Sequence, residues 1–486
     1  MNRRQVLAVT FAICSTIITS FLSNVQPFNS EVGPGSFSVA SGDRREVKEP
    51  SIPESVCATL TAAVSMHDRQ ANAETESVPP DTHRIQQALD ECAKSGGNQV
   101  VIQLSPSGES RDFLSGPLQL HAGEILLLAP EVTLFASRNP ADFQAPGGVA
   151  CGTISSKENG CVPFISLANH SGIESTENRN GARGAIDGRG DQEMIGRGLS
   201  WWQLAQAAKD RGYQNVPRLL QAQKVNDVTL YSLDLINSPG SHVSFKDGTG
   251  FTAWGVHIKT PVTARNTDGI DPAGASDVTV IHSSIMDGDD GIAIKAGSQP
   301  SAHITIKDNI VDGSHGISIG SETTAGVSDV LVVDNTINGM DSTGKMGGTA
   351  AGIRIKSSAA VGGVVRQITY KNTCVLNTKI PLSFDTHYSS GGGHAIPWYE
   401  DIVVDGFQSS STLRNGYVEL NGWDNQHALG VKFSGTAIDT TNLKASNAKI
   451  VDAGVRFGGR PLGPLGPTVH ISREPARGNV PDCAAG

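Results

Sequence analysis

The chain has 486 residues and a mass of 50.8 kDa, a length that suits either two ordinary domains or one elongated, repetitive domain. Its 55 glycines and its low aromatic content of 5% favour the elongated form, because they supply tight turns and few bulky core residues. The net charge of −10 and the pI of about 5.7 argue against nucleic acid as a partner, since phosphates require a basic surface.

Residues 1–23 have the charge order of a secretion signal. Arg3 and Arg4 precede a mainly apolar stretch from Val6 to Leu22. A twin-arginine signal is the alternative interpretation, and no A-x-A cleavage site marks the end of the segment. Residues 24–55 are rich in glycine, serine, proline and charge without periodicity, which predicts a flexible leader. We expect a secreted chain with no membrane segment after signal removal.

Six cysteines remain after Cys14, which lies in the signal, and they suit an oxidising compartment in which disulfides persist. Cys151 and Cys161 bracket a polar loop, and this spacing predicts one disulfide. Cys57 and Cys92 flank a segment that ends in a short amphipathic helix, and this arrangement suggests a second disulfide.

The last two cysteines, Cys374 and Cys483, have no obvious partner except each other, and the sequence alone does not assign their connectivity. Metal ligation is the rival interpretation of the cysteines. No C-x-x-C motif or clustered Cys/His spacing supports it, so we expect no metal.

The central part of the chain repeats itself. Apolar–polar–apolar triplets begin at Val228, Phe251, Val278, Ile304, Val330, Ile368 and Ile402. A second strand follows in most units, as GIDPAG, GIAIKAG, GISIGSE and GIRIKSS, starting at Gly269, Gly291, Gly316 and Gly352. One unit is too short to bury an apolar face alone, so the units must stack as a solenoid.

We therefore predict an all-β fold, a right-handed parallel β-helix over residues 56–450, with a short N-terminal capping helix and a C-terminal tail or cap over 451–486. A β-propeller is the alternative, but the sequence lacks the regular four-strand blades and the recurring aromatic or Trp-Asp signatures that it would need. Stacked strands lie about 4.8 Å apart, so equivalent positions form ladders along the axis. Ser283, Asn309 and Asn335 are expected to form such a ladder at a turn.

Polar residues form a second ladder when the later strands are aligned on their Gly-Ile pairs. The residue before the glycine is Asp268, then Asp290, then His315, and Asp289 precedes Asp290 at a tight turn. Alternation directs the isoleucines inward, so Arg354 and Lys356 both project outward on the same face. Three carboxylates, an imidazole and two cations are thus predicted to converge on one patch.

This combination suits the hydrolysis of an acidic carbohydrate. Glycoside hydrolysis needs a protonated carboxyl group and a carboxylate that activates water, and crowding of like charges raises the pKa of at least one acid. The two cations can bind carboxylates of the substrate. Lys295 shares the alignment column of Lys356, but a solvated lysine is the favoured interpretation. Trp201 and Trp202 could stack on a sugar, although anchoring of a helix is favoured.

Four motifs in this order resemble the signatures of the polygalacturonase family of glycoside hydrolases, bacterial branch. They are Asn266-Thr267-Asp268, Gly288-Asp289-Asp290, Ser314-His315-Gly316 and Arg354-Ile355-Lys356. The similarity extends over roughly residues 55 to 440. Departures from the family pattern are Ser314 and Gly291, and we expect them to alter turn geometry without loss of activity.

The resemblance implies hydrolysis of α-1,4 bonds in polygalacturonate (pectin) with inversion, without a cofactor. It assigns Asp289 as general acid, Asp268 and Asp290 as the residues that hold and deprotonate water, and His315 as the residue that tunes the acid. Asn266, Arg354, Lys356 and Tyr388 would contact the substrate. Strand spacing alone would bring Asp268 and Asp290 closer than the roughly 6.5–9.5 Å typical of inverting pairs, so that general rule points instead to retention.

The hypothesis is a secreted, monomeric polygalacturonase that cuts within its polymer. The alternatives are an exo-acting polygalacturonase, a calcium-dependent pectate lyase on the same fold, and a non-catalytic β-helix that only binds sugar. The sequence does not reveal loop shape, so it leaves internal and terminal cutting undecided.

Overall fold

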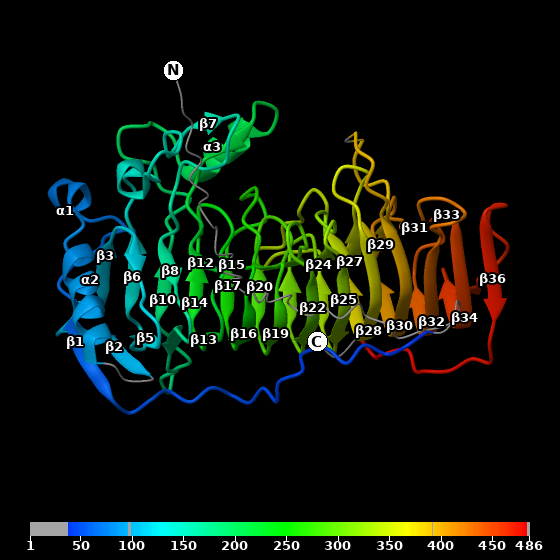
Figure 1. The fold of residues 1–486 in the computed structure, drawn as a ribbon, viewed down its shortest axis with the longest axis horizontal. Coiled ribbons are helices and arrows are strands. Elements are labelled where there is room, and N and C mark those ends of the chain that lie inside the picture. The colour runs from blue at the N-terminus through cyan, green and yellow to red at the C-terminus, as the bar shows by residue number, and fades with distance from the viewer. Residues whose placement is uncertain (1–36, 96–98, 391, 484–486) are drawn as a thin grey trace, which may run out of the picture. The chain divides into compact units, whose positions relative to one another are not determined.

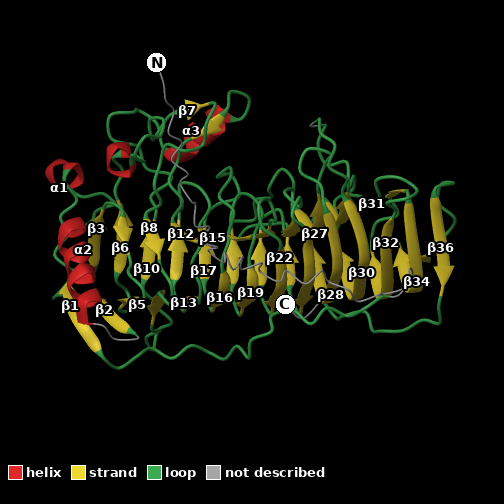
Figure 2. Cartoon of the chain, viewed as in Figure 1, coloured by secondary structure: helices red, strands yellow, loops and turns green. Residues whose placement is uncertain are grey.

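The computed structural model describes residues 37–95, 99–390 and 392–483. The predicted signal peptide and residues 24–36 of the predicted leader lie outside the described residues. From residue 56 onward the chain winds into stacked coils, and each coil adds a strand to as many as three parallel columns (Figures 1 and 2). The predicted all-β parallel β-helix is confirmed.

Column 1 is the longest of the three columns and runs through the whole stack. Its strands are β1 (Val56–Thr61), β2 (Val100–Ser105), β5 (Glu124–Leu128), β9 (Gly172–Ser175), β13 (Val228–Tyr231), β16 (Thr249–Trp254), β19 (Ser276–Ile281), β22 (Ser301–Lys307), β25 (Val327–Val333), β28 (Val364–Leu376), β30 (Trp398–Ser410), β32 (Leu429–Ile438), β34 (Ala448–Phe457) and β36 (Val469–Arg473).

Columns 2 and 3 complete the coils. Column 2 contains β3 (Asp112–Ser115), β6 (Thr133–Ala136), β10 (Ala185–Asp187), β14 (Asp234–Ile236), β17 (His257–Lys259), β20 (Ser284–Met286), β23 (Ile310–Asp312) and β26 (Thr336–Asn338), and it ends on the second half of β28. Column 3 contains β4 (Leu118–Gln119), β8 (Ile165–Leu167), β12 (Leu220–Gln223), β15 (Val243–Lys246), β18 (Ile270–Ala273), β21 (Ile292–Ile294), β24 (Ile317–Ile319), β27 (Ala351–Lys356), β29 (Ile380–Asp385), β31 (Val418–Asn421) and β33 (Leu443–Ser446).

The register of column 1 matches the predicted repeat. The seven residues that begin the triplets are consecutive partners along the column, from Val228 to Ile402, and all seven are buried. In column 3, Ile270, Ile292, Ile317 and Ile353 are likewise partners in successive strands. Apolar residues with a period set by the coil therefore fill one continuous core along the axis.

The predicted polar ladder at the turn is also present. Asn309 Nδ2 donates to Asn335 Oδ1 at 3.0 Å and to the carbonyl of Val280 at 3.0 Å. The backbone N–H of Ser283 donates to Asn309 Oδ1 at 2.9 Å. These buried amides satisfy backbone groups that the turn would otherwise leave without partners.

Helices are few among the described residues and lie at the periphery. α2 (Asp81–Cys92) covers the N-terminal end of the core with its apolar stripe, and this is the predicted capping helix (Figure 1). α1 (Ala73–Ser77) and two short 3₁₀ turns, Ala93–Ser95 and Pro140–Phe143, are minor elements.

The helix α3 (Trp201–Ala208) begins with the paired tryptophans. Trp201 is fully buried, and its ring meets Phe143 edge-on at 6.0 Å. Trp202 Nε1 donates to the carbonyl of Ser238 at 2.8 Å. The tryptophans therefore anchor the helix, as favoured from the sequence. Beside this helix the two-stranded antiparallel sheet of β7 (Ile154–Ser155) and β11 (Tyr213–Gln214) belongs to the same group of loops.

Three disulfides join the described cysteines. Cys57–Cys92 and Cys151–Cys161 form as predicted. Cys374 and Cys483, left unassigned from the sequence, pair with each other across a separation of 109 residues.

The leader differs from the flexible segment predicted for residues 24–55. Residues 38–49, here named the N-terminal strap, cross the outer surface of column 1 and bond one coil after another (Figure 1, dark blue). The coil partners are Asp401, Thr369, Asp329, Thr305, Asp277, the carbonyl of Phe251 and Tyr231. Polar composition without periodicity is therefore compatible with an ordered segment when each residue finds a partner on a regular surface.

The predicted boundary at residue 450 also needs correction. It falls inside β34, and β36 continues column 1 beyond it, while β35 (Arg460–Pro461) pairs antiparallel with β34. Residues 474–483 then turn back over column 1, where the Gly435 N–H donates to the carbonyl of Arg477 at 2.8 Å, and end at the disulfide of Cys483.

Candidate active site

The turns that lead into column 3 place the predicted acids and the histidine on consecutive coils. Asp268 precedes β18, Asp290 precedes β21 and His315 precedes β24, and the partnership of Ile270, Ile292 and Ile317 fixes their alignment. The ladder predicted from the Gly-Ile pairs is therefore present in the structure.

Arg354 and Lys356 come from β27 and contact Asp290, which lies two coils earlier in the stack. Lys356 Nζ lies 2.7 Å from Asp290 Oδ2, and an Arg354 guanidinium nitrogen lies 3.6 Å from Asp290 Oδ1. Ser318 Oγ also donates to Asp290 Oδ1 at 2.8 Å. Both cations point away from the core as predicted, but only 4% and 6% of their surfaces are exposed. They form part of a buried charge network.

Asp289 is held by a histidine and an amide. His315 Nδ1 lies 3.0 Å from Asp289 Oδ1, and Asn266 Nδ2 donates to Asp289 Oδ2 at 3.1 Å. The backbone N–H of His315 also donates to the carbonyl of Asp289. Asn266, His315 and Asp289, which lie 49 residues apart at most in the chain, thus form one hydrogen-bonded group.

Asp268 has a partner that the sequence interpretation missed. Lys295, favoured there as a solvated lysine, lies with its Nζ 3.0 Å from Asp268 Oδ2 and 3.2 Å from Asp271 Oδ2. Asp271 was also missed. A signal was available, because the register places Asp271 in the outward row that continues through Ser318 to Arg354.

The three predicted acids differ in the direction of their pKa shifts. Burial and the neighbouring carboxylate of Asp271 raise the pKa of Asp268 well above its usual range. Burial also opposes ionisation of Asp289 and Asp290. However, the hydrogen bond from His315 holds the pKa of Asp289 below its usual range, and Lys356 with Arg354 holds that of Asp290 far below it. Among the three predicted acids the raised pKa is therefore that of Asp268, with burial as the main cause and the like charge of Asp271 as the second.

Tyr388 follows β29 and lies against the two cations. Its ring centroid is 5.5 Å from the guanidinium carbon of Arg354 and 5.2 Å from Lys356 Nζ, distances at which a cation interacts with an aromatic face. The side chain is 47% exposed. Tyr388 can thus contact a molecule that reaches Arg354 and Lys356 from solvent.

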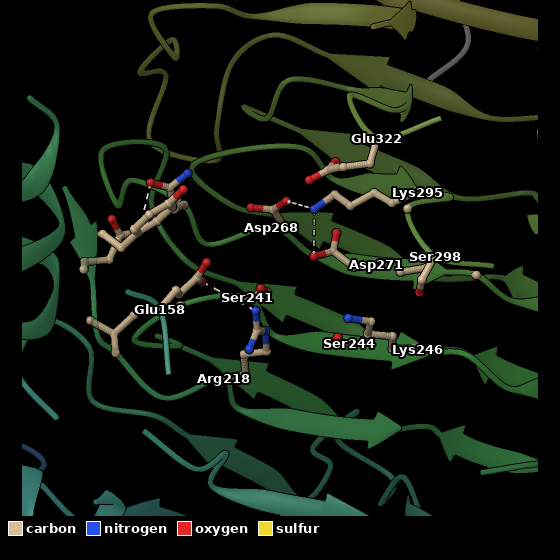
Figure 3. Close-up of a pocket in the computed structure, with 18 of the residues that line it drawn as sticks. Glu158, Arg218, Ser241, Ser244, Lys246, Asp268, Asp271, Lys295, Ser298 and Glu322 are labelled. Atoms are coloured by element: carbon tan, nitrogen blue, oxygen red, sulfur yellow. Dashed lines mark hydrogen bonds and ion pairs between the residues drawn. The ribbon is translucent and has the colours of Figure 1, made fainter. Parts of the chain in front are cut away.

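A cavity of about 540 Å³ opens beside Asp268 (Figure 3). Asn266, Asp268, Asp271 and Lys295 line one part of it. The opposite part includes Arg218 and Glu158, whose side chains approach to 3.6 Å, and Glu158 belongs to the loop closed by Cys151–Cys161. The predicted cluster is therefore continuous with an open, strongly polar cavity.

The cluster of Asp289, Asp290 and His315 is poorly suited to bind a metal ion. Asp289, Asp290 and His315 bring one ligand atom each within 4.8 Å of one another. However, Lys356 and Arg354 already supply positive charge to Asp290, and calcium prefers six to eight oxygen ligands. The cluster is better suited to acid–base chemistry.

Comparison with known proteins identifies relatives over most of the chain. The profile described as "Glycosyl hydrolases family 28" matches residues 162–455, which is more than half of the chain. A protein of Pectobacterium parmentieri named endo-polygalacturonase is 38% identical over 425 residues, covering 86% of this chain and 96% of the relative. One of Pectobacterium carotovorum subsp. carotovorum with the same name is 40% identical over 397 residues, covering 80% and 88%.

A solved structure extends the similarity to the fold. The polygalacturonase from Erwinia carotovora ssp. carotovora superposes with a TM-score of 0.69 at 35% identity, covering 90% of this chain and all of that chain.

Proposed function

Because the chain belongs to glycosyl hydrolases family 28, we propose that it hydrolyses the α-1,4 bonds of polygalacturonate, cutting within the polymer. The observation that carries this proposal is the site itself, in which three carboxyl groups and His315 share one surface with Arg354 and Lys356. The names of the two Pectobacterium relatives support internal cutting.

In the proposed mechanism, Asp289 donates a proton to the leaving oxygen and His315 is its proton partner across 3.0 Å. A carboxylate of the substrate would sit near Arg354 and Lys356. Lys356 contributes to the low pKa of Asp289, and the negative charge of the substrate would offset the charge of Lys356. The pKa of Asp289 would then rise in the complex, so that Asp289 holds its proton more readily.

Asp290 and Asp268 hold and deprotonate the attacking water in this proposal. Asp290 suits the role because Lys356 keeps it ionised. Attack by water opposite the leaving group gives inversion at the anomeric carbon. Nuclear magnetic resonance of the first-formed product tests this step. A product with the β configuration at the new reducing end supports inversion, and an α product would indicate retention.

An assay on polygalacturonate in the presence of a chelator tests the reaction class. We expect new reducing ends without ultraviolet absorbance. Chelator-sensitive ultraviolet absorbance would instead indicate a lyase, and no product from the wild-type protein would favour a binding module. Intermediate oligomers early in the time course indicate internal cutting, whereas monomer or dimer alone would indicate an exo-acting enzyme.

Asp289→Asn is the matched variant, because the amide keeps the shape of the side chain and cannot donate a carboxylic proton. We expect turnover to fall by several orders of magnitude, roughly 10²- to 10⁴-fold from loss of acid catalysis alone, while polygalacturonate binding is retained. Equal turnover in Asp289→Asn and the wild type would contradict the proposed role.

The proposal also places the enzyme outside the cell as a monomer. Support comes from the signal-like residues 1–23 and from three disulfides, which persist in oxidising compartments. Within the described ranges, no helix is both long enough and apolar enough to cross a membrane. Detection of the chain in the culture medium and size-exclusion chromatography test the two statements.

A further inference from the structure

Lys295 lies between two acids at the edge of the proposed site. It follows β21 directly, and its ammonium group lies 3.0 Å from Asp268 and 3.2 Å from Asp271 (Figure 3). Its side chain is 25% exposed, compared with 12% for Asp268 and 9% for Asp271. The three groups form a mostly buried triad of two carboxyl groups and one ammonium group.

The surroundings of Asp268 are otherwise mainly acidic. The titratable and charged groups around Asp268 come from several elements. They are Asp271 on β18, Lys295 after β21, His242 before β15, and Asp287, Asp289 and Asp290 in the turn between β20 and β21. Burial lowers the pKa of His242 to about 4, so this ring is neutral near pH 6 and serves as a hydrogen-bond partner of the Asp268 carbonyl. Lys295 therefore supplies the nearby positive charge that opposes the neighbouring carboxylates.

The geometry points to Lys295 as a positioning residue that favours the ionised form of Asp268 against its acidic neighbours and orients its carboxylate for water activation. This inference rests on the proposed hydrolysis, because it concerns how one of its carboxylates is maintained. Lys295 acts through Asp268 and not through the substrate. Arg354 and Lys356 lie around Asp290 on a later strand.

The chain offers a matched control for a lysine that only adds positive charge to the cavity and so attracts the acidic substrate. Lys246 on β15 stands in the same row as Lys295, because Ala273 is the register partner of both. Lys246 lines the same cavity but is exposed and has no ion-pair partner within the described residues. Loss of its charge changes the potential of the cavity without touching the Asp268 triad.

The test compares Lys295→Met, Lys295→Arg and Lys246→Met by kcat and KM for polygalacturonate from about pH 4 to pH 8. Loss of the Lys295 charge raises the pKa of Asp268 further, so the acidic limb of the profile should move to higher pH. At about pH 5 we expect kcat to fall at least tenfold with little change in KM. Lys295→Arg should recover part of kcat, and Lys246→Met should leave the acidic limb in place.

A second variant separates charge from folding. Asp271→Asn in the Lys295→Met background removes one carboxylate and restores the net charge of the triad, so the acidic limb should return toward that of the wild type. If Lys295→Met does not fold, Asp271→Asn alone remains informative, because it should move the limb to lower pH.

Two results would overturn the inference. One is a higher KM in Lys295→Met with no change in kcat or in the acidic limb of the pH profile, which would make Lys295 a substrate contact. The other is a limb that does not respond to Asp271→Asn. Either result requires an active wild-type enzyme. Absence of reducing ends from the wild type would instead contradict the proposed function.

Discussion

Glu174 is a buried carboxyl group without an ion-pair partner among the described residues. It lies in β9, only 3% exposed, and its Oε2 has no hydrogen-bond partner within the described residues. Burial raises the pKa of Glu174 to about 7, whereas the unfolded chain should titrate near 4.5. Between about pH 4.5 and pH 7, Glu174 is ionised in the unfolded chain but still protonated in the folded chain. The free energy of unfolding therefore falls as pH rises through this window, by about 3 kcal/mol in total.

We predict that Glu174→Gln raises the melting temperature at pH 8. At this pH the wild type must either bury the charged carboxylate of Glu174 or bind a proton to it, and both cost free energy of folding. The difference should nearly vanish at pH 4, where both side chains are neutral. Calorimetry at the two pH values measures this effect, and Glu109→Gln at an exposed position is the control. An equal change at both pH values would contradict the electrostatic explanation.

The predictable site residues share a feature that spacing can reveal. Asp268, Asp290 and His315 occupy one position of a repeat, so alignment of the repeats brings them together without knowledge of side-chain conformations. Lys295 was misjudged because its partners depend on the path of a long, flexible side chain across two strands. Spacing gives backbone register, whereas ion pairing and burial depend on the neighbours that cover each side chain.

At the scale of elements, the asparagine ladder explains how the turns between columns 1 and 2 are kept uniform. Asn309 and Asn335 each donate to carbonyls of an earlier coil, and each accepts the backbone N–H of the equivalent residue one coil before. Identical side chains at identical positions thus connect consecutive coils. Hydrogen bonds of this kind require a fixed register, which the period of the sequence made predictable.

We predict that Asn335→Ala lowers the free energy of unfolding by about 2–4 kcal/mol, because it removes several buried hydrogen bonds and leaves the N–H of Asn309 without its acceptor. Thermal unfolding followed by circular dichroism measures the loss. Lys307→Ala, at an exposed position near the same ladder, should have a melting temperature within about one degree of the wild type. Equal losses in the two variants would show that the ladder has no special role.

At the scale of the molecule, the period of apolar residues predicted the coils and their core but not the N-terminal strap. The strap has no period, and its partners lie far away in the chain, as in the pair Ser41 and Asp329, which are 288 residues apart. Such contacts depend on a surface that exists only after the coils have stacked. The same reason explains why the strand β36 and the returning C-terminal segment were missed.

The strap yields a prediction about local opening. Asp329 accepts hydrogen bonds from Ser41 N, Ser41 Oγ and Gly42 N at 2.6, 2.7 and 2.9 Å, just before the basic pair Arg44 and Arg45. Each of these hydrogen bonds should contribute about 1 kcal/mol to the free energy of local opening. Loss of all three should therefore make opening of this part of the strap roughly 100-fold more frequent.

Asp329→Ala should therefore let trypsin cut after Arg44 or Arg45 up to about 100-fold faster, provided that the strap opens and closes rapidly compared with cleavage. Mass spectrometry of the released N-terminal fragment gives the rate. Asp308→Ala is the control, because Asp308 pairs with His282 and not with the strap. Turnover should be unchanged in both variants, since the strap lies on column 1 and the acids lie where the chain enters column 3. Unaltered cleavage in Asp329→Ala would mean that the remaining contacts, such as Arg44 with Asp277, hold the strap by themselves.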